Sequence, residues 1–241
     1  MDESKNRLIL VMMQKIILNI PHSSCCGVFD NEIGRWPRNP HFMNECVNKW
    51  TDWYTDYMFS TDNCKVKQVV FPYSRFVCDV ERLENDELEE HGQGIIYREF
   101  GGIARKELSE NTKEYLLSLR TEHLRKLSDS LTMDSVLIDC HSFPCEIYNT
   151  DICIGFNQDD SYDPKLVEFV KRTFEEYGYS VQLNKPYSNS ITPETTFPYR
   201  SIMIEINKRV YLNEKNKTIS LTPLKAMRWF GCMNKIYEGI L

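Results

Sequence analysis

Four segments of the chain combine an apolar run with polar residues that could bind a metal ion or transfer a proton. They are IILNIPHSS at 16–24, SRFVCDVER at 74–82, VLIDCHSFP at 136–144 and SIMIEINKRVY at 201–211. Each apolar run has the length and composition of a buried β-strand. Open α/β sheets bind ligands beyond the carboxyl ends of their strands. We therefore predict one site that is built from residues far apart in the sequence.

Two of the five histidines stand where such strands end. His22 and His141 each follow an apolar run and each is followed by serine. Two imidazoles and one carboxylate form a three-ligand zinc site with an open position for water, which is typical of catalytic rather than structural zinc. The alternative interpretation is two histidines placed at strand ends by coincidence.

Carboxylates in the other two segments could complete this chemistry. Asp79 and Glu81 alternate along the predicted strand 76–80 and would share a face, and Arg82 offers a planar guanidinium to a carboxylate ligand. A plain salt bridge between Asp79 and Arg82 is the alternative. Glu205 interrupts an apolar run, and burying an unpaired charge is costly, so it should face a metal, a substrate or another partner. We expect Glu205 to take a proton from zinc-bound water and deliver it to a leaving amine.

The elements that position these residues alternate between helices and strands. Apolar residues spaced by three and four predict helices over about 44–60, 111–131, 163–178 and 222–237. Asn111 or Thr112 could cap the second helix, and Asp163 with Pro164 and Thr222 with Pro223 open the last two. Further strands are predicted at 67–71, 152–156 and 180–183.

This alternation predicts an α/β fold with a mainly parallel central sheet. The length of 241 residues suits a single domain. Two stretches, 83–110 and 184–199, lack periodic apolar residues and are expected to be long ordered loops, which in compact domains are usually functional. Met12 and Met13 directly precede the first strand, which suggests that residues 1–11 are a disordered or upstream-start extension.

Composition excludes several classes of function. A net charge of −6 and the lack of a Lys/Arg cluster argue against a nucleic-acid partner. No stretch approaches the roughly 18 apolar residues that a membrane helix needs. Nine cysteines, an odd number without a CxxC pair, indicate reduced thiols and a cytoplasmic location.

The segments PHSS, SRFVCDVER, IDCHSFP and IEINKRVYLNE, in this order, resemble the N-formylglutamate amidohydrolase family. More distantly, that family is similar in fold to the zinc carboxypeptidases and the aspartoacylase-like deacylases. The resemblance covers about residues 15–235. It implies a three-layer α/β/α sandwich around a mixed sheet, and hydrolysis of N-formyl-L-glutamate to formate and L-glutamate, typically as a step in histidine degradation.

The resemblance also implies roles for individual residues. His22 and His141 correspond to metal ligands, Glu205 to a general base and acid, and Arg82 to the arginine that holds a substrate carboxylate. Apart from the resemblance, Arg75 or Arg209 is expected to help Arg82 pair with substrate carboxylates. Asn207 and Arg209 continue the alternation on the side of Glu205 and are also expected to bind substrate, with a polar strand exit as the alternative interpretation. The implied ligands are Zn²⁺ and a small acidic N-acyl amino acid.

Three departures from the family pattern bear on specificity and on the metal site. Glu81 replaces the usual asparagine of a DLNR-like motif, which puts a negative charge where an acidic substrate would bind. Ser24 replaces the glycine of the family's PHSG motif, and the HxxE ligand spacing of the carboxypeptidases falls on Cys25 instead of a glutamate. The third metal ligand therefore stays open among Asp79, Glu81 and Cys25, in that order of preference. The loop NKPYSNSIT at 184–192 has Ser188, Asn189 and Ser190 where the family's loop contains glycines, which would alter the acyl group or amine that fits.

Two alternative functions remain. One is a related zinc amidase, deacylase or carboxypeptidase-like enzyme acting on another N-acyl amino acid or peptide. The other is a ligand-binding protein on the same scaffold without catalysis.

Overall fold

The structure is a computed structural model that describes residues 15–38, 42–84 and 86–241. The chain divides into two compact units, each built from separate stretches of sequence. The sheet unit contains the described residues up to Ile20, with Tyr54–Val69 and Leu127–Leu241, and the loop unit contains Pro21–Trp53 and Val70–Lys126. The expected extension over residues 1–11 lies outside the described residues, and the single domain stays a prediction.

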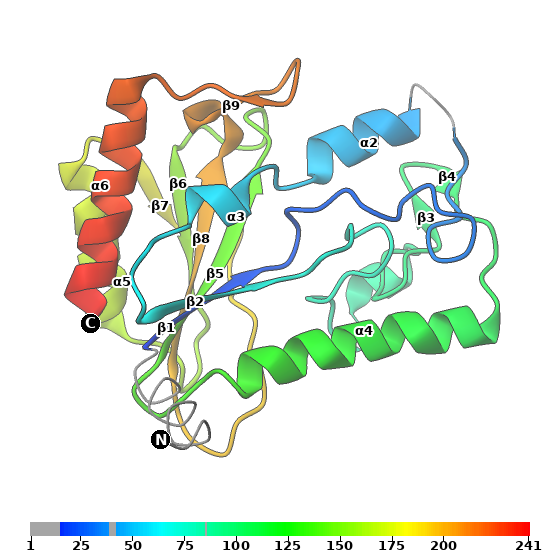
Figure 1. The fold of residues 1–241 in the computed structure, drawn as a ribbon, viewed down its shortest axis with the longest axis horizontal. Coiled ribbons are helices and arrows are strands. Elements are labelled where there is room, and N and C mark those ends of the chain that lie inside the picture. Colours follow the sequence, from blue (N-terminus) through cyan, green and yellow to red (C-terminus); the bar gives the residue numbers. More distant parts are fainter. Residues whose placement is uncertain (1–14, 39–41, 85) are drawn as a thin grey trace, which may run out of the picture. The chain divides into compact units, whose positions relative to one another are not determined.

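The sheet unit is built on a six-stranded sheet in the order β2-β1-β5-β8-β6-β7 (Figure 1). Its strands are β1 Ile16–Ile20, β2 Val66–Val70, β5 Val136–Phe143, β6 Ile152–Gly155, β7 Val181–Leu183 and β8 Arg200–Asn207. The pairs β1–β5, β5–β8 and β6–β7 are parallel, whereas β6 runs antiparallel to β8. The predicted α/β fold with a mixed, mainly parallel sheet and flanking helices is confirmed.

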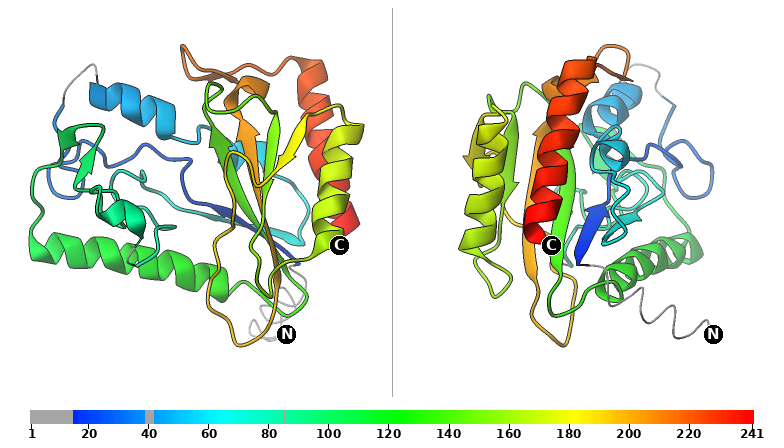
Figure 2. Two further views of the ribbon diagram at one scale, coloured as in Figure 1. Left: turned by 180° about the vertical axis from the view of Figure 1, so that it is seen from behind. Right: turned by 60° about the vertical axis from the view of Figure 1, so that its left-hand side comes forward.

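Among the described residues, the helices of the sheet unit are α3 Thr55–Met58, α5 Pro164–Glu176 and α6 Pro223–Ile240. Helices α5 and α6 lie side by side (Figure 2), where Trp229 packs against Phe174 and donates a hydrogen bond to the carbonyl of Met58. Asp163 caps α5 and Thr222 caps α6 through side-chain oxygens that accept backbone N–H groups, as predicted. The remaining short elements are η2 Lys208–Val210, β9 Leu212–Asn213 and β10 Thr218–Ile219.

The loop unit has little regular structure apart from helices. Its elements are α2 Phe42–Trp50, η1 Glu87–Glu89, β3 Glu99–Phe100, β4 Ile103–Ala104 and, up to Lys126, α4 Glu110–Ser128. One apolar cluster joins α2 to Trp36, Phe76 and Tyr97, and a second joins Leu116 of α4 to Val77. Helix α4 is capped by Ser109, whose hydroxyl accepts the N–H of Thr112, so the predicted cap at Asn111 or Thr112 was wrong. Among the described residues, no helix combines the length and the hydropathy that a membrane span requires.

The predicted helix over 44–60 is wrong as a single element, because α2 ends at Trp50 and α3 begins at Thr55. The N–H of Asp52 donates to the carbonyl of His22 at 2.9 Å instead of to a helical carbonyl four residues back. Tyr54 then adopts a left-handed conformation with φ of 62°, which a helix cannot continue through.

The predicted strand over 76–80 is also wrong, because this segment is a series of turns. The carbonyl of Ser74 accepts the N–H groups of Val77 and Cys78, and its hydroxyl accepts that of Phe76. Asp79 likewise accepts the N–H of Glu81 on its own side chain. Serine and aspartate oxygens that bond nearby backbone compete with a sheet ladder. Asp79 and Glu81 therefore do not share a strand face.

Candidate functional site

The centre of the sheet unit carries His141 and Glu205 on one buried face. The two residues are register partners on the parallel strands β5 and β8, so their side chains project from the same side of the sheet. Cys153 of β6 is the register partner of Glu205 on its other side. Exposure is 5% for His141 and 7% for Glu205. Burial, and the charge of Glu205 to a smaller degree, raises the pKa of Cys153 to about 11, so this neighbour is a neutral thiol.

Asp139 orients His141 from two residues earlier on the same strand face. Its Oδ1 lies 3.1 Å from Nε2 of His141 and accepts a hydrogen bond of 2.8 Å from the amide of Asn19. Its Oδ2 accepts the N–H of Ile191 at 3.1 Å. A carboxylate can only accept, so Nε2 of His141 carries its proton and, in the neutral ring, Nδ1 carries the lone pair. Metal-binding histidines are typically held by a carboxylate in this way.

In the loop unit, His22 has the same type of support. Its Nε2 lies 3.0 Å from Oδ1 of Asp79, and its Nδ1 faces Glu81 at 3.7 Å and Asp52 at 3.8 Å. His22 and Asp79 are both almost completely buried. In this unit as in the sheet unit, a buried carboxylate takes the Nε2 side of the imidazole, which leaves Nδ1 as the nitrogen that can bind a metal ion.

Asp79 is already engaged on both oxygens. Its Oδ2 accepts hydrogen bonds from Arg75 at 3.0 Å and from the hydroxyl of Tyr97 at 2.8 Å, and Nε of Arg82 lies 3.7 Å away. Burial alone would raise the pKa of Asp79, but the charge of Arg75, with those of His22 and Arg82, holds it well below its usual value. Asp79 is thus an ionised orienting group, and Glu81 is the carboxylate nearer to Nδ1 of His22.

The two predicted arginines of the loop unit flank this network. Side-chain exposure is 21% for Arg75 and 23% for Arg82, so each of these side chains is in part open to solvent. Arg82 also donates to the hydroxyl of Tyr97 at 3.4 Å and lies 3.8 Å from Asp86. These two cations are placed to meet an anionic ligand.

Asn207 and Arg209, also predicted to bind substrate, have other partners within the sheet unit. The amide of Asn207 donates to the carbonyls of Tyr148 and Thr150, and its oxygen accepts the N–H of Arg209. The guanidinium of Arg209 is paired with Asp151 at 3.1 Å. These contacts indicate that Asn207 shapes the end of β8.

Cys25, the last of the three carboxylate or thiol candidates for the metal, is exposed. Partial burial of the Cys25 thiol raises its pKa, and the neighbouring Cys26 raises it further by a smaller amount. Because only the thiolate binds a metal well, this shift disfavours Cys25 as a ligand.

These networks include residues that were not anticipated from the sequence, among them Asp52, Tyr97, Arg105 and Asp139. Asp139 carried a signal, because it precedes His141 by two residues and so shares its strand face. Tyr97 and Arg105 lie in an irregular stretch that no periodicity marks. Arg105 is buried and donates to the carbonyls of Ile33, Gly34, Val77 and Tyr97. Burial lowers its pKa to about 10, so it stays a cation at neutral pH.

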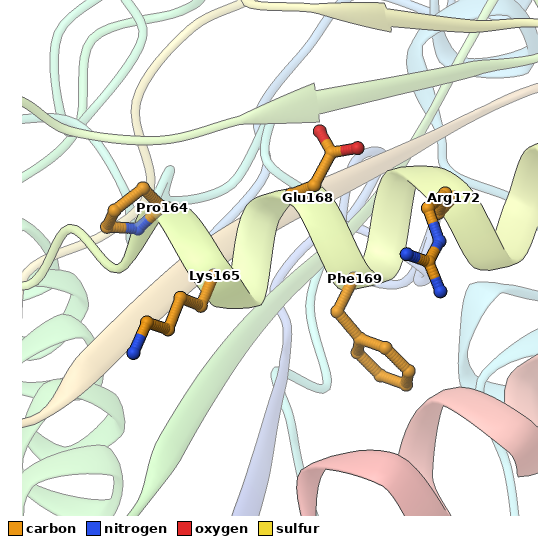
Figure 3. A pocket seen from close by; sticks show the side chains of 5 residues that line it. All are labelled: Pro164, Lys165, Glu168, Phe169 and Arg172. Atoms are coloured by element: carbon orange, nitrogen blue, oxygen red, sulfur yellow. The ribbon is translucent and has the colours of Figure 1, made fainter.

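A groove on helix α5 is separate from these networks (Figure 3). It is lined by Pro164, Lys165, Glu168, Phe169 and Arg172. None of these residues belongs to a predicted catalytic or binding group, and the groove supplies no imidazole or thiol. It therefore does not compete with the polar face of the sheet as a catalytic centre.

A family model and a solved structure that are similar to this chain both belong to N-formylglutamate amidohydrolases. The family model for N-formylglutamate amidohydrolase matches residues 15–212. Among curated proteins, none matches the sequence significantly. The N-formylglutamate amidohydrolase of Ralstonia eutropha JMP134 has a similar fold, with a TM-score of 0.75 and 15% identity over 94% of this chain and 93% of that one. A gene product of Agrobacterium tumefaciens has a TM-score of 0.63 and 16% identity over 94% and 92% of the two chains.

Proposed function

Because the chain belongs to the N-formylglutamate amidohydrolase family, whose members are amide-bond hydrolases, we propose that it cleaves the formyl amide of N-formyl-L-glutamate. The products would be formate and L-glutamate. The observation that carries this proposal is the pair His141 and Glu205, in register on one buried face of the sheet. A buried imidazole beside a buried carboxylate suits amide hydrolysis, because one can hold a metal ion while the other moves a proton.

We further propose that His22 and His141 bind one zinc ion through Nδ1, with Glu81 as the third ligand. The donor set fits zinc, since each imidazole has a buried carboxylate on its Nε2 side, Asp79 or Asp139. Glu81 is preferred over Asp79 because both oxygens of Asp79 are already engaged. A bound zinc ion supplies Lewis acidity and lowers the pKa of water at the site towards about 7.

The chain's own residues would then carry the proton and hold the substrate. Glu205 would accept a proton from the attacking water at its carboxylate and return it to the amine nitrogen as the C–N bond breaks, which releases formic acid and the neutral amine. The proton of formic acid then passes to the amine, so that the products are formate and the ammonium form of L-glutamate. Arg82 and Arg75 bind the substrate carboxylates, because a guanidinium pairs with a carboxylate through two parallel hydrogen bonds. Asp79 and Asp139 keep the two imidazoles in the tautomer that presents Nδ1.

A related amidase that acts on another N-acyl amino acid is the second candidate. Glu81 favours it, since a carboxylate 3.7 Å from Nδ1 of His22 would repel a doubly charged substrate unless a metal ion neutralises it. A role in histidine degradation and a cytoplasmic location are proposed from the family and from the nine free cysteines.

The test combines metal content with formate release. We expect near-stoichiometric zinc by elemental analysis and chelator-sensitive formate release from N-formyl-L-glutamate. Glu205→Gln should lower turnover by about 100-fold or more while zinc is retained, whereas His141→Gln should lose zinc. Glu168→Gln on the surface of α5 is the matched control and should behave as wild type.

Each contrary outcome removes a different part of the proposal. Zinc without formate release would exclude the substrate and direct the assay to other N-acyl amino acids. The lack of zinc under metal-replete conditions would exclude the metal site. Near-normal turnover of Glu205→Gln would exclude Glu205 as the proton carrier.

A further inference from the structure

Tyr97 is a fully buried tyrosine in the irregular stretch between η1 and β3. Its ring stacks on Phe100 with the planes 7° apart and meets Phe76 edge to face at 5.9 Å. Its carbonyl accepts a hydrogen bond of 3.1 Å from Arg105. The ring and the backbone are therefore held on several sides, and the hydroxyl has a defined position.

The hydroxyl of Tyr97 bonds to two charged side chains. It donates to Oδ2 of Asp79 at 2.8 Å and accepts from Nη2 of Arg82 at 3.4 Å. The direction of donation is fixed, because a carboxylate can only accept and a guanidinium can only donate. The other oxygen of Asp79 lies 3.0 Å from Nε2 of His22. One hydrogen-bonded chain thus runs from Arg82 through Tyr97 and Asp79 to His22.

We propose that Tyr97 is a positioning residue, whose hydroxyl couples the guanidinium of Arg82 to the imidazole of His22. The group assigned to a substrate carboxylate and the group assigned to the metal are then aligned by a single buried chain of side chains. This inference rests on the proposed function, because the roles of Arg82 and His22 come from it.

Packing alone does not account for a tyrosine at this position. The apolar cluster around the ring would accept phenylalanine, and a buried hydroxyl is costly unless it is hydrogen-bonded. Oδ2 of Asp79 would keep a donor if the hydroxyl were absent, because Arg75 donates a hydrogen bond of 3.0 Å to the same oxygen. By contrast, Arg82 reaches Asp79 directly only at 3.7 Å, which is long for a hydrogen bond. The link between Arg82 and Asp79 is what the hydroxyl supplies.

Tyr97→Phe tests this link, because it removes one oxygen atom and keeps the packed ring. We expect kcat/KM for N-formyl-L-glutamate to fall about 10- to 100-fold, mainly through a higher KM, as is typical when a charge-assisted hydrogen bond is lost. Arg82→Lys should lower it as well, and the double variant should lose less than the product of the two single losses. Tyr237→Phe is the matched control, since that buried hydroxyl donates at 2.8 Å to a carbonyl in the sheet unit. It should leave kcat/KM unchanged.

A readout independent of activity separates this inference from the proposed function. The ¹⁵N chemical shifts of the His22 ring, assigned by their loss in His22→Gln, should change in Tyr97→Phe and stay constant in Tyr237→Phe. If wild type releases no formate but the His22 signals move, the proposed substrate is excluded and the coupling stands. Strictly additive losses in kcat/KM, or His22 shifts identical in wild type and Tyr97→Phe, would overturn the coupling.

Discussion

Replacing Asp79 with asparagine removes one charge from the network around His22 and keeps the shape of the side chain. The carboxylate accepts hydrogen bonds on both oxygens, from His22 on one and from Arg75 and Tyr97 on the other. An amide offers only one acceptor oxygen. In the variant, its NH₂ group must therefore face either His22 or the pair of donors on the opposite side.

The size of the effect follows from the burial of each partner. Asp79 is 1% exposed, and removing one member of a buried ion pair costs about 3–5 kcal/mol. Arg75 and Arg82 are each more than a fifth exposed, so water can solvate them in part after the change. We therefore expect the free energy of unfolding to fall by about 3 kcal/mol, the lower end of that range. Activity should fall by about 10- to 100-fold, because Asp79 orients a proposed metal ligand.

The effect should depend on pH in a defined direction. The folded-state pKa of Asp79 is depressed, so its stabilising contribution is complete above the unfolded-state value of about 3.9 and is lost as the pH falls through the folded-state value. The stability difference between wild type and Asp79→Asn should become smaller as the pH falls below about 4.

Urea denaturation of both proteins between pH 8 and pH 3, followed by circular dichroism, measures this difference. The double variant Asp79→Asn/Arg75→Met also removes the cation that has lost its partner, so its free energy of unfolding should be about 1–2 kcal/mol higher than that of Asp79→Asn. A loss below about 1 kcal/mol at pH 7, or a difference that does not change on acidification, would refute the assignment of Asp79 as a buried, ionised partner.

Three further changes test the supports of the site. Arg105→Met should lower the free energy of unfolding by about 3 kcal/mol, because buried carbonyls lose their donor, and thermal denaturation should show Arg105→Lys recovering part of it. Gly155→Ala places a Cβ atom 2.9 Å from the carbonyl oxygen of Asn189, so it should displace that loop, cost about 1–3 kcal/mol and lower kcat/KM; an unchanged kcat/KM would separate the loop from substrate binding. Asn207→Ala should cost about 2 kcal/mol in urea denaturation, and a loss of zinc in this variant would contradict its structural role.

Much of the sheet unit could be predicted from the sequence, because its signals are local. The apolar runs of β1, β5 and β8 and the caps of α5 and α6 lie at the predicted positions. His141 was singled out because it follows an apolar run and can bind a metal ion, and Glu205 because a charge within an apolar run is costly to bury without a partner. The predicted strands already placed both residues near one edge of the sheet, and the structure adds that they are register partners on β5 and β8.

The loop unit was less predictable, because its chain is held by partners distant in sequence. The apolar stretch over 76–80 has the composition of a strand, and a short apolar run cannot be told from another kind of buried segment by its pattern. Its course is set by Arg105, which donates to the carbonyl of Val77, and by Ile95, whose carbonyl accepts the N–H of Asp79 at 2.8 Å. No spacing rule in the sequence connects these residues.

The sequence by itself therefore determined the fold class, the family and the residue types that could do the chemistry, because apolar periodicity, helix caps and short motifs are local properties. Only the tertiary structure decided which partners the atoms of each polar side chain contact. In the structure, both oxygens of Asp79 accept hydrogen bonds, Nδ1 of His22 faces Glu81, and the hydroxyl of Tyr97 lies between Asp79 and Arg82. The physical reason is that a buried polar group needs a hydrogen-bonding partner, and which partner comes within about 3 Å depends on how distant segments pack.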